Sequence, residues 1–583
     1  MVGRCRCSFL RLAVIALIWA STVHAQPAPD TPTFNGSPIY FSVHGNPAAP
    51  PANILGSGVT PEMLEQGVYD PGDTLQMLAA NRWTGQTNTA VFGLFDEGAH
   101  QQHTIAFKMR AGVGGLGGAV ALLPTETFGD DGPITALPAN FQWDEPNLEP
   151  ASHGLVIAFD THNPPTGNWF NAMGNLYDRP QREVSIHYNG VELANVLSPV
   201  DYPCPLVPEG DREGFVDVEV NVDYDIGGGY VTVVMDQTAV IDRLFVPQMR
   251  PRESRLAFGA SSDTDFAGPF DLRALRYQVA KPVPADQPAP ETELAVLADN
   301  AVLTADKQTQ TFDVVLPQKE VGEIGRLLMN LKLDGAPGGI DPWSCRGAIY
   351  IYADDGERYE IVRFMTPFGR PYEWTFDVTD YALLLRGRRR VMLWVESRGT
   401  GQTPETTPGW AVTADLIYYP GKPERQVVAI QNLWTGEPEY GDPANPLENF
   451  FDPKTIQRPA DAAGAELRLT VTGHGTHPTT YNAAEFMPAD RTVIINNQHR
   501  LGNLLWDESA YLNPCRPQGG TWKFDRAGWT PGSIVQPWRI DLTNHFDPTG
   551  NARIHYVPMS YENLSRDQAK ATHWVESQVI YYK

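Results

Sequence analysis

The sequence predicts an all-β protein built as a string of β-sandwiches. Short runs in which apolar and polar residues alternate recur from residue 90 onward, as in "HTIAFKMRAG" (103–112) and "FVDVEVNVDYD" (215–225). Gly, Asn, Asp and Pro separate these runs, which is typical of strands joined by turns. Helical periodicity is scarce outside residues 60–80. Half-buried strands of this kind pair into sheets that pack face to face.

Length and composition indicate several domains. The chain has 583 residues, of which 42% are hydrophobic. At about 100–200 residues per domain, this length predicts three or four domains. The formal net charge of −25 argues against nucleic acid as a partner, because binding phosphate backbones requires a positive surface.

The N-terminal 25 residues read as a signal peptide. Arg4, Arg6 and Arg11 form a basic region, "LAVIALIWA" (12–20) is an apolar core, and "VHA" (23–25) is a small-x-small cleavage site. The apolar run is too short to span a bilayer comfortably. No later segment reads as transmembrane. We therefore expect a secreted or periplasmic protein without membrane insertion.

Three cysteines follow the signal peptide, namely Cys204, Cys345 and Cys515. An odd number in an exported protein leaves at least one thiol free or paired outside the chain. Their wide spacing does not resemble a zinc framework.

Composition shifts divide the chain. A Pro- and Ala-rich stretch, "QVAKPVPADQPAPETE" (278–293), is the clearest boundary. Two sets of short strands follow it. The predicted division is a signal peptide (1–25), an N-terminal extension (26–89), a first sandwich (90–280), a Pro-rich linker (281–294), a second sandwich (295–422) and a third (423–583).

The first sandwich resembles the concanavalin-like (L-type lectin) fold. The resemblance is carried by "GLVIAFDTHNPPTGN", "VSIHYNGVEL" and "RLAFGASSDTDFAGPFDLRALRYQV". Lectins of this type hold metals with an acidic-x-Asp pair and a following Asn. Here Ala158 replaces the first acid, while Asp160 and Asn163 remain. The resemblance implies one structural calcium at Asp160 and Asn163; the alternative is that both side chains cap a turn.

Residues 295–583 resemble the peptide-N-glycosidase F family, whose fold is a pair of eight-stranded jelly rolls. The match runs through "YEIVRFMTPF" (359–368) and "FDVTDYALLLRG" (376–387) in one roll. In the other roll it runs through "LRLTVTGHG" (467–475) and "GTWKFDRAGWTPGSIVQPWRIDLTN" (520–544). The resemblance implies hydrolysis of the asparagine–glycan amide bond, with N-glycoproteins or glycopeptides as partners and no cofactor required for catalysis.

The family uses a principal Asp and two supporting Glu residues. Carboxylates suit amide hydrolysis because they can activate water and deliver a proton. The supporting residues fall on Glu485 in "AAEF" and Glu396 in "LWVES". The family's arginine falls on Arg526, which could bind a carboxylate or a sugar oxygen, and Trp529 follows it closely. Glu396 could alternatively face solvent.

The principal Asp is missing from the corner where the resemblance places it. This corner reads Asp341-Pro342-Trp343-Ser344-Cys345-Arg346, so Ser344 or Cys345 takes its place, depending on the register. Asp341 or a stabilised Cys345 thiolate could substitute. Cys345 could instead form a disulfide with Cys515. Trp343, Ser344 and Arg346 are candidate substrate contacts, and Trp343 could alternatively pack in the core.

Three histidines, His474, His477 and His499, lie near the second motif. His474 and His477 are predicted to contact sugar; the alternative is a His-bound metal and a metalloenzyme. The leading prediction is an exported amidase of N-glycoproteins with an altered catalytic corner. The alternative is a catalytically inactive protein that binds glycoconjugates on the same folds.

Overall fold

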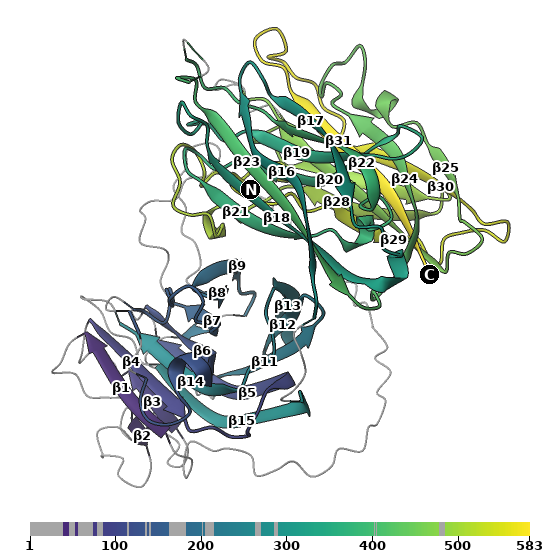
Figure 1. The fold of residues 1–583 in the computed structure, drawn as a ribbon. Helices are drawn as coiled ribbons and strands as arrows, with labels where there is room; N and C mark the ends of the chain where they lie inside the picture. The colour runs from purple at the N-terminus through teal and green to yellow at the C-terminus, as the bar shows by residue number, and fades with distance from the viewer. Residues whose placement is uncertain are drawn as a thin grey trace, which may run out of the picture.

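The computed structural model describes residues 39–45, 53–55, 74–78, 85–112, 116–134, 137–138, 141–161, 182–200, 202–204, 215–262, 270–284, 290–401, 403, 405–476 and 484–583. This part of the chain forms six β-sheets in three sandwiches (Figure 1). The predicted signal peptide, Asn163 and His477 lie outside the described residues.

The first sandwich has two large sheets. One contains, in spatial order, β1 (Ile39–Gly45), β4 (Gln86–Phe92), β14 (Ser254–Ser261), β6 (Gly117–Pro124), β7 (Leu155–Asp160), β8 (Glu183–Tyr188) and β9 (Val191–Leu197). The other contains β13 (Thr238–Pro247), β12 (Gly228–Met235), β11 (Val216–Asp225), β5 (His100–Gly112), β15 (Phe270–Pro282), β3 (Thr74–Leu78) and β2 (Asn53–Leu55), and β10 (Pro203–Cys204) pairs with β5. A single helical turn, α2 (Thr125–Phe128), follows β6.

This sandwich starts earlier than the sequence analysis places it. Residues 26–89 are assigned there to an extension, but β1, β2 and β3 pair into the two sheets. The stretch with helical periodicity contains β3, whose side chains are mostly buried against the core and whose backbone pairs with β15 and β2. Tertiary pairing here overrides the local pattern.

The second sandwich, called roll 1 below, has four strands in each sheet. One sheet has the order β16 (Glu293–Thr304), β23 (Gly409–Pro420), β18 (Ile324–Gly335) and β21 (Tyr372–Asp377). The other has the order β17 (Thr309–Leu316), β22 (Gly387–Val395), β19 (Arg346–Tyr352) and β20 (Arg358–Met365). Short 3-10 helices occur at Val321–Glu323 and Thr379–Tyr381.

The third sandwich, called roll 2 below, repeats this topology. Its first sheet is β24 (Val427–Gly436), β31 (Thr572–Tyr582), β26 (Gly464–His474) and β29 (Trp538–Asp541). Its second sheet is β25 (Lys454–Gln457), β30 (Asn551–Pro558), β27 (Ala489–Ile495) and β28 (His499–Leu505). Short 3-10 helices occur at Leu447–Phe450 and Ala510–Leu512.

Each roll follows the jelly-roll strand order. Counted along its own chain, each roll places strands 1-8-3-6 in one sheet and 2-7-4-5 in the other. The predicted all-β class, with a concanavalin-like sandwich followed by two eight-stranded jelly rolls, is therefore confirmed for the described residues.

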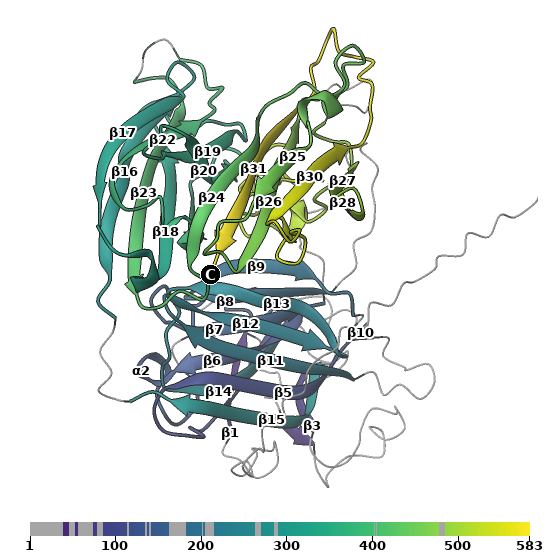
Figure 2. The ribbon, with the colours of Figure 1, turned by 90° about the vertical axis from the view of Figure 1, so that its right-hand side faces the viewer.

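The two rolls pack closely against each other. The sheet of roll 1 that contains β20 faces the sheet of roll 2 that contains β31. Arg363 of β20 donates from Nη1 to the Trp574 carbonyl (2.8 Å), and Tyr381 donates to Gln578 (2.8 Å). All of β31 except its two end residues is buried, because one face covers the core of roll 2 and the other covers roll 1. Figure 2 shows the rolls side by side above the first sandwich.

The first sandwich contacts the rolls at two places. At one, Arg326 of β18 binds Asp225 (2.9 Å) and Tyr230 (3.0 Å) of the sandwich and Asp377 of its own roll (2.5 Å). At the other, β9 lies beneath the loop between β28 and β29 of roll 2. Within the described residues, no helix has the length and apolar character needed to cross a membrane.

Candidate active site

The candidate site lies at one edge of the interface between the two rolls. Arg346 is the first residue of β19 and Glu396 directly follows β22, and the Glu396 amide donates to the Arg346 carbonyl (2.8 Å). These two strands are neighbours in one sheet, so their paired ends hold both side chains side by side. His474 ends β26 on the facing sheet of roll 2.

Glu396 is held by two arginines. Its Oε2 accepts from Arg346 Nε (3.1 Å), and its Oε1 accepts from Arg398 Nε (3.2 Å) and Nη2 (3.1 Å). Burial opposes ionisation of this carboxyl, but the two guanidinium groups outweigh it and keep its pKa below the usual value. The Glu396 side chain is 16% exposed, so the solvent-facing alternative does not describe it.

Glu485 is fixed by its backbone and by one arginine. Its amide donates to the Gly475 carbonyl (3.3 Å), and its carbonyl accepts from the Ala527 amide (2.9 Å). Its Oε1 accepts from Arg526 Nε (3.2 Å). A Cβ at Gly473 would lie 2.1 Å from the Ala484 carbonyl oxygen, so glycine is needed for this loop to approach β26.

Arg526 is almost fully buried and anchors the carboxylate of Glu485. Its Nη1 donates to the carbonyls of Phe524 (2.6 Å) and Thr521 (3.1 Å), so only a few rotamers are open to it. Gly528 has φ +77°, which an L side chain rarely adopts, and a Cβ there would meet Leu505 at 2.5 Å. The glycine of "DRAGW" therefore sets the turn between Arg526 and Trp529.

Aromatic rings connect the two carboxylates. The Arg526 guanidinium lies 4.8 Å over the Trp529 ring, and Trp529 lies 5.4 Å from the His474 ring. His474 in turn lies 6.3 Å from Trp574, and Arg346 lies 5.8 Å over that same ring. This contiguous chain of contacts runs from Glu485 in roll 2 to the Arg346–Glu396 pair in roll 1.

His474 is a neutral side chain at this site. Burial, together with the positive charges of Arg346 and Arg363, holds its pKa well below the usual value. Its Nε2 is 2.8 Å from the Thr472 hydroxyl. A neutral imidazole can accept a hydrogen bond from a sugar hydroxyl or donate one to it without adding a charge to the site.

The Asp341 carboxylate is not a free acid, because protein groups bind both of its oxygens. Its Oδ2 accepts from the Ser397 hydroxyl (2.7 Å) and the amides of Arg398 (2.6 Å) and Gly399 (2.9 Å), and its Oδ1 accepts from the Trp343 amide (2.9 Å). The side chain is completely buried. Through these contacts Asp341 holds the corner at residues 341–346 against the loop that follows β22.

Cys345 is not poised as a base either. It is 2% exposed, and burial, followed by the charges of Asp341 and Glu396, raises the pKa of its thiol. The Ser344 hydroxyl is buried and has no hydrogen-bond partner in the described part of the chain. Trp343 is 53% exposed, so the core-packing alternative is wrong and the ring is available to stack on a sugar.

The disulfide between Cys345 and Cys515 is not formed, since both are buried free thiols. Burial raises the pKa of Cys515 to about 12. We expect iodoacetamide at pH 8 to leave both thiols unmodified in the native protein and to alkylate both after unfolding. Peptide mass spectrometry of the two samples measures this, and rapid native alkylation of Cys345 would contradict the buried, neutral thiol.

The predicted metal ligands are only partly described. Asp160 ends β7, is 8% exposed and pairs across the sheet with Glu183; Asn163, its predicted partner, is outside the described part. His499 lies on β28 against His545, with ring centroids 4.7 Å apart. Among the residues that the structure describes, no group of three or more His, Cys, Asp or Glu side chains could hold a metal.

Sequence reasoning missed Arg398, Glu437 and Trp574. Glu437 Oε1 accepts from Arg346 Nη1 (2.6 Å) and from the Thr572 hydroxyl (2.8 Å), which ties β19 to roll 2. Arg398 stands two residues after Glu396, a spacing that places side chains on one face of a strand and could have signalled it. No local pattern distinguishes Trp574, because its role depends on the approach of the other roll.

Comparison with known proteins agrees with this double jelly roll. A family model described as "Peptide-N-glycosidase F, C terminal" matches residues 447–581. The curated peptide-N(4)-(N-acetyl-β-D-glucosaminyl)asparagine amidase F of Elizabethkingia miricola is 30% identical over 300 residues, covering 46% of this chain and 81% of the relative. The chain belongs to the peptide-N-glycosidase F family.

Two solved structures are also similar. A crystal structure of peptide-N(4)-(N-acetyl-β-D-glucosaminyl)asparagine amidase has a TM-score of 0.44 and 24% identity, with coverage of 50% of this chain and 96% of that chain. The structure of PNGF-II in space group P21 has a TM-score of 0.39 and 12% identity, with coverage of 82% of this chain and 99% of that chain.

Proposed function

We propose that this chain is an exported amidase that hydrolyses the bond between an asparagine side chain and its glycan in N-glycoproteins or glycopeptides. Glu485 and Glu396 carry the reaction at a corner where Ser344 and Cys345 stand in place of the family's Asp. Family membership supports the substrate class, and the N-terminal sequence supports export to the periplasm or the medium.

The proposed chemistry assigns different tasks to the two carboxylates. Glu485 takes a proton from water as the water oxygen adds to the amide carbon, and returns that proton to the nitrogen as the C–N bond breaks. The products are a protein-bound aspartate and a glycosylamine. Glu396 stays ionised because Arg346 and Arg398 flank it. It therefore orients the guanidinium groups of these two arginines and does not act as an acid.

One observation carries this proposal. Glu485 and Glu396 come from different rolls, each is paired with a partly or fully buried arginine, and a contiguous series of ring and guanidinium contacts through Trp529, His474 and Trp574 joins the two pairs. Exposed Trp343 lies at the start of β19, where it can receive a sugar ring.

The second candidate is a glycoconjugate-binding protein without turnover. Its specific support is the corner itself, where the Cys345 thiol is buried and both oxygens of Asp341 are occupied by four protein donors. The corner therefore offers no free carboxylate in place of the missing Asp. Binding through Trp343 and His474 requires none, whereas Trp529, also predicted to contact substrate, is only 6% exposed and donates to the Gly473 carbonyl.

Hydrolysis in heavy-oxygen water separates the two candidates. The mature protein is incubated with a denatured N-glycopeptide from pH 4 to 9, and the peptide is analysed by mass spectrometry. We expect conversion of the glycosylated Asn to Asp with one heavy oxygen. Glycopeptide binding without conversion at any pH would favour the binding protein, and the absence of both would overturn both candidates.

Removal of metal ions is expected to leave this activity unchanged, because the proposed steps use only carboxylates and water. The measurement compares the heavy-oxygen assay before and after dialysis against a chelator. Loss of activity that added metal restores would instead support the His-dependent metalloenzyme. A structural calcium at Asp160 and Asn163 is a separate proposal; its loss is expected to lower the unfolding temperature of the first sandwich, not the rate.

A further inference from the structure

The loop between β28 and β29 bears on the function of the first sandwich. Residues 506–533, called the bridging segment below, belong to roll 2 and carry Arg526 and Trp529 of the candidate site. The Asp507 amide donates to the Arg526 carbonyl (2.7 Å), and the Arg526 amide donates to the Asp507 carbonyl (3.1 Å). These bonds hold the beginning of the segment beside Arg526, at the candidate site. Between these points it extends to the first sandwich.

An apolar cluster docks the bridging segment on the sandwich. Tyr511, Leu512 and Trp522 are each at most 3% exposed, and they pack with Leu197 of β9 and Phe368 of roll 1. Three separate parts of the chain thus share one small core. Three large apolar side chains are removed from water together here, so the segment is packed against the sandwich.

An ionic clamp reinforces this contact. Arg516 donates from Nη2 to Glu145 (2.9 Å), its Nη1 lies 3.0 Å from Glu192 of β9, and the same Nη1 donates to the Leu512 carbonyl (3.2 Å). The side chains of Arg516 and Glu192 are only 10% and 13% exposed. One buried guanidinium therefore joins the bridging segment to two carboxylates of the sandwich.

Roll 1 holds the other side of the segment. Arg370 donates to the carbonyls of Pro517 (2.8 Å) and Cys515 (3.1 Å), and Gln518 accepts from the Phe368 amide (3.0 Å). Most of these contacts are made by backbone groups that cannot rearrange independently. Arg516 and Arg526, which binds Glu485, thus lie on one segment that contacts both the sandwich and roll 1.

We propose that the first sandwich stabilises the candidate active site, and that Arg516 is a positioning residue that fixes Arg526 and Trp529 through the bridging segment. The part of this inference that concerns turnover rests on the proposed amidase function. The part that concerns order of the segment does not.

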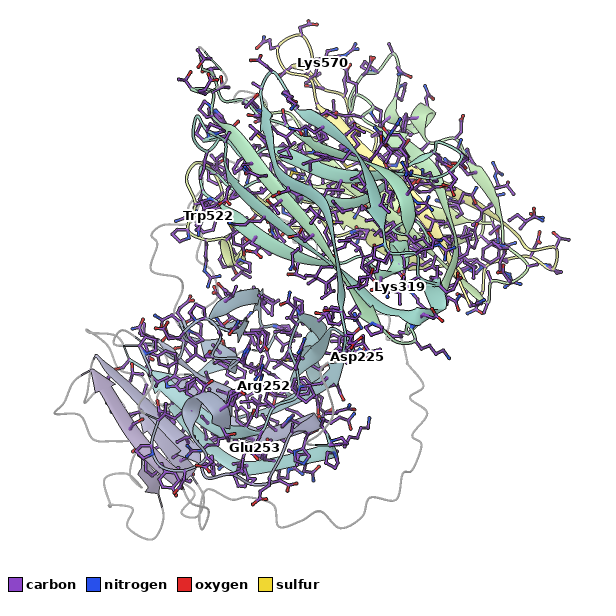
Figure 3. The ribbon with its side chains drawn as sticks, viewed as in Figure 1. Asp225, Arg252, Glu253, Lys319, Trp522 and Lys570 are labelled. Atoms are coloured by element: carbon purple, nitrogen blue, oxygen red, sulfur yellow. The ribbon has the colours of Figure 1, made fainter. Side chains whose placement is uncertain are left out.

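The second contact between sandwich and rolls provides a matched control. Arg326 and Asp225 join the same two bodies, but no residue of this pair contacts the bridging segment in the described structure. Figure 3 shows Trp522 near the left end, and Asp225 near the right end, of the boundary between the sandwich and the rolls. Asp225→Asn thus weakens the attachment of the sandwich without touching the clamp.

The test compares Arg516→Met, Arg516→Lys and Asp225→Asn in the full chain. Hydrogen exchange of residues 506–533 is expected to accelerate at least about tenfold in Arg516→Met, less in Arg516→Lys, and not in Asp225→Asn. In the heavy-oxygen assay kcat is expected to fall between about tenfold and about a hundredfold in Arg516→Met, with a smaller change in KM.

These outcomes keep the two proposals apart. If the wild type shows no turnover, the amidase fails, while the exchange of residues 506–533 still tests the clamp. Unchanged hydrogen exchange in Arg516→Met, equally accelerated exchange in Asp225→Asn, or faster exchange with an unchanged kcat would each overturn the proposed role of the first sandwich. If Arg516→Met does not fold, Glu145→Gln removes one arm of the clamp and is expected to give the same changes at smaller size.

Discussion

Replacing Glu485 by glutamine is expected to lower kcat for release of the glycan at least about a hundredfold, because a positioned acid–base group contributes about 10²–10⁴ in rate. Glutamine has the same size and can still accept the hydrogen bond from Arg526 Nε, but it cannot take a proton from water. The heavy-oxygen assay on a glycopeptide measures the loss, with substrate in excess so that kcat is compared directly.

The fold of this variant should be intact, since the loop that carries Glu485 is held by backbone bonds to Gly475 and Ala527. Asp313→Asn provides the control, because Asp313 and Arg390 form an exposed pair on the outer edge of roll 1 and its loss should change nothing. Retained turnover in Glu485→Gln would remove Glu485 from the proposed role and leave Glu396 as the remaining carboxylate.

Part of the fold was predictable because the burial of several strands follows the alternation of the sequence. The run "FVDVEVNVDYD" (215–225) contains β11, in which buried and less buried side chains alternate from Val216 to Asp223. The strands β1, β2 and β3 were missed. β1 and β2 lie at the edges of the two sheets and β3 lies between β2 and β15, so their assignment as strands depends on pairing partners elsewhere in the chain.

The sequence motifs predicted which residues lie together at the candidate site, but not the hydrogen bonds of the corner at residues 341–346. The four residues taken from the family motifs, Glu396, Glu485, Arg526 and Trp529, are brought to one edge of the interface between the rolls. The direction of the Asp341 side chain could not be predicted, because it depends on the amides of Arg398 and Gly399 in a loop distant in sequence. The Asp341 carboxylate, predicted as a substitute acid, is instead bonded to the backbone and to Ser397.

Asp341→Ala is expected to destabilise roll 1 by about 3 kcal/mol, because hydrogen bonds to a charged group contribute about 1.5–3 kcal/mol each and are not additive. The change leaves the buried amides of Arg398, Gly399 and Trp343 without their acceptor. Calorimetry should show a fall of several degrees in the unfolding transition of this roll. Glycopeptide affinity should fall as well, because Arg398 and Trp343 lose their anchor.

An exposed aspartate with similar bonding separates burial from hydrogen bonding as the cause. Asp547 accepts from the Thr549 amide (2.8 Å) and hydroxyl (2.6 Å) and from the Asn551 amide (2.9 Å), but it lies in an exposed turn where water can replace it. Asp547→Ala should therefore shift the unfolding temperature far less.

The two roles considered for Asp341 also predict opposite results for Asp341→Asn. A catalytic acid would lose turnover with stability kept, whereas the anchor assigned by these contacts loses stability first, and turnover measured below the unfolding transition is largely retained.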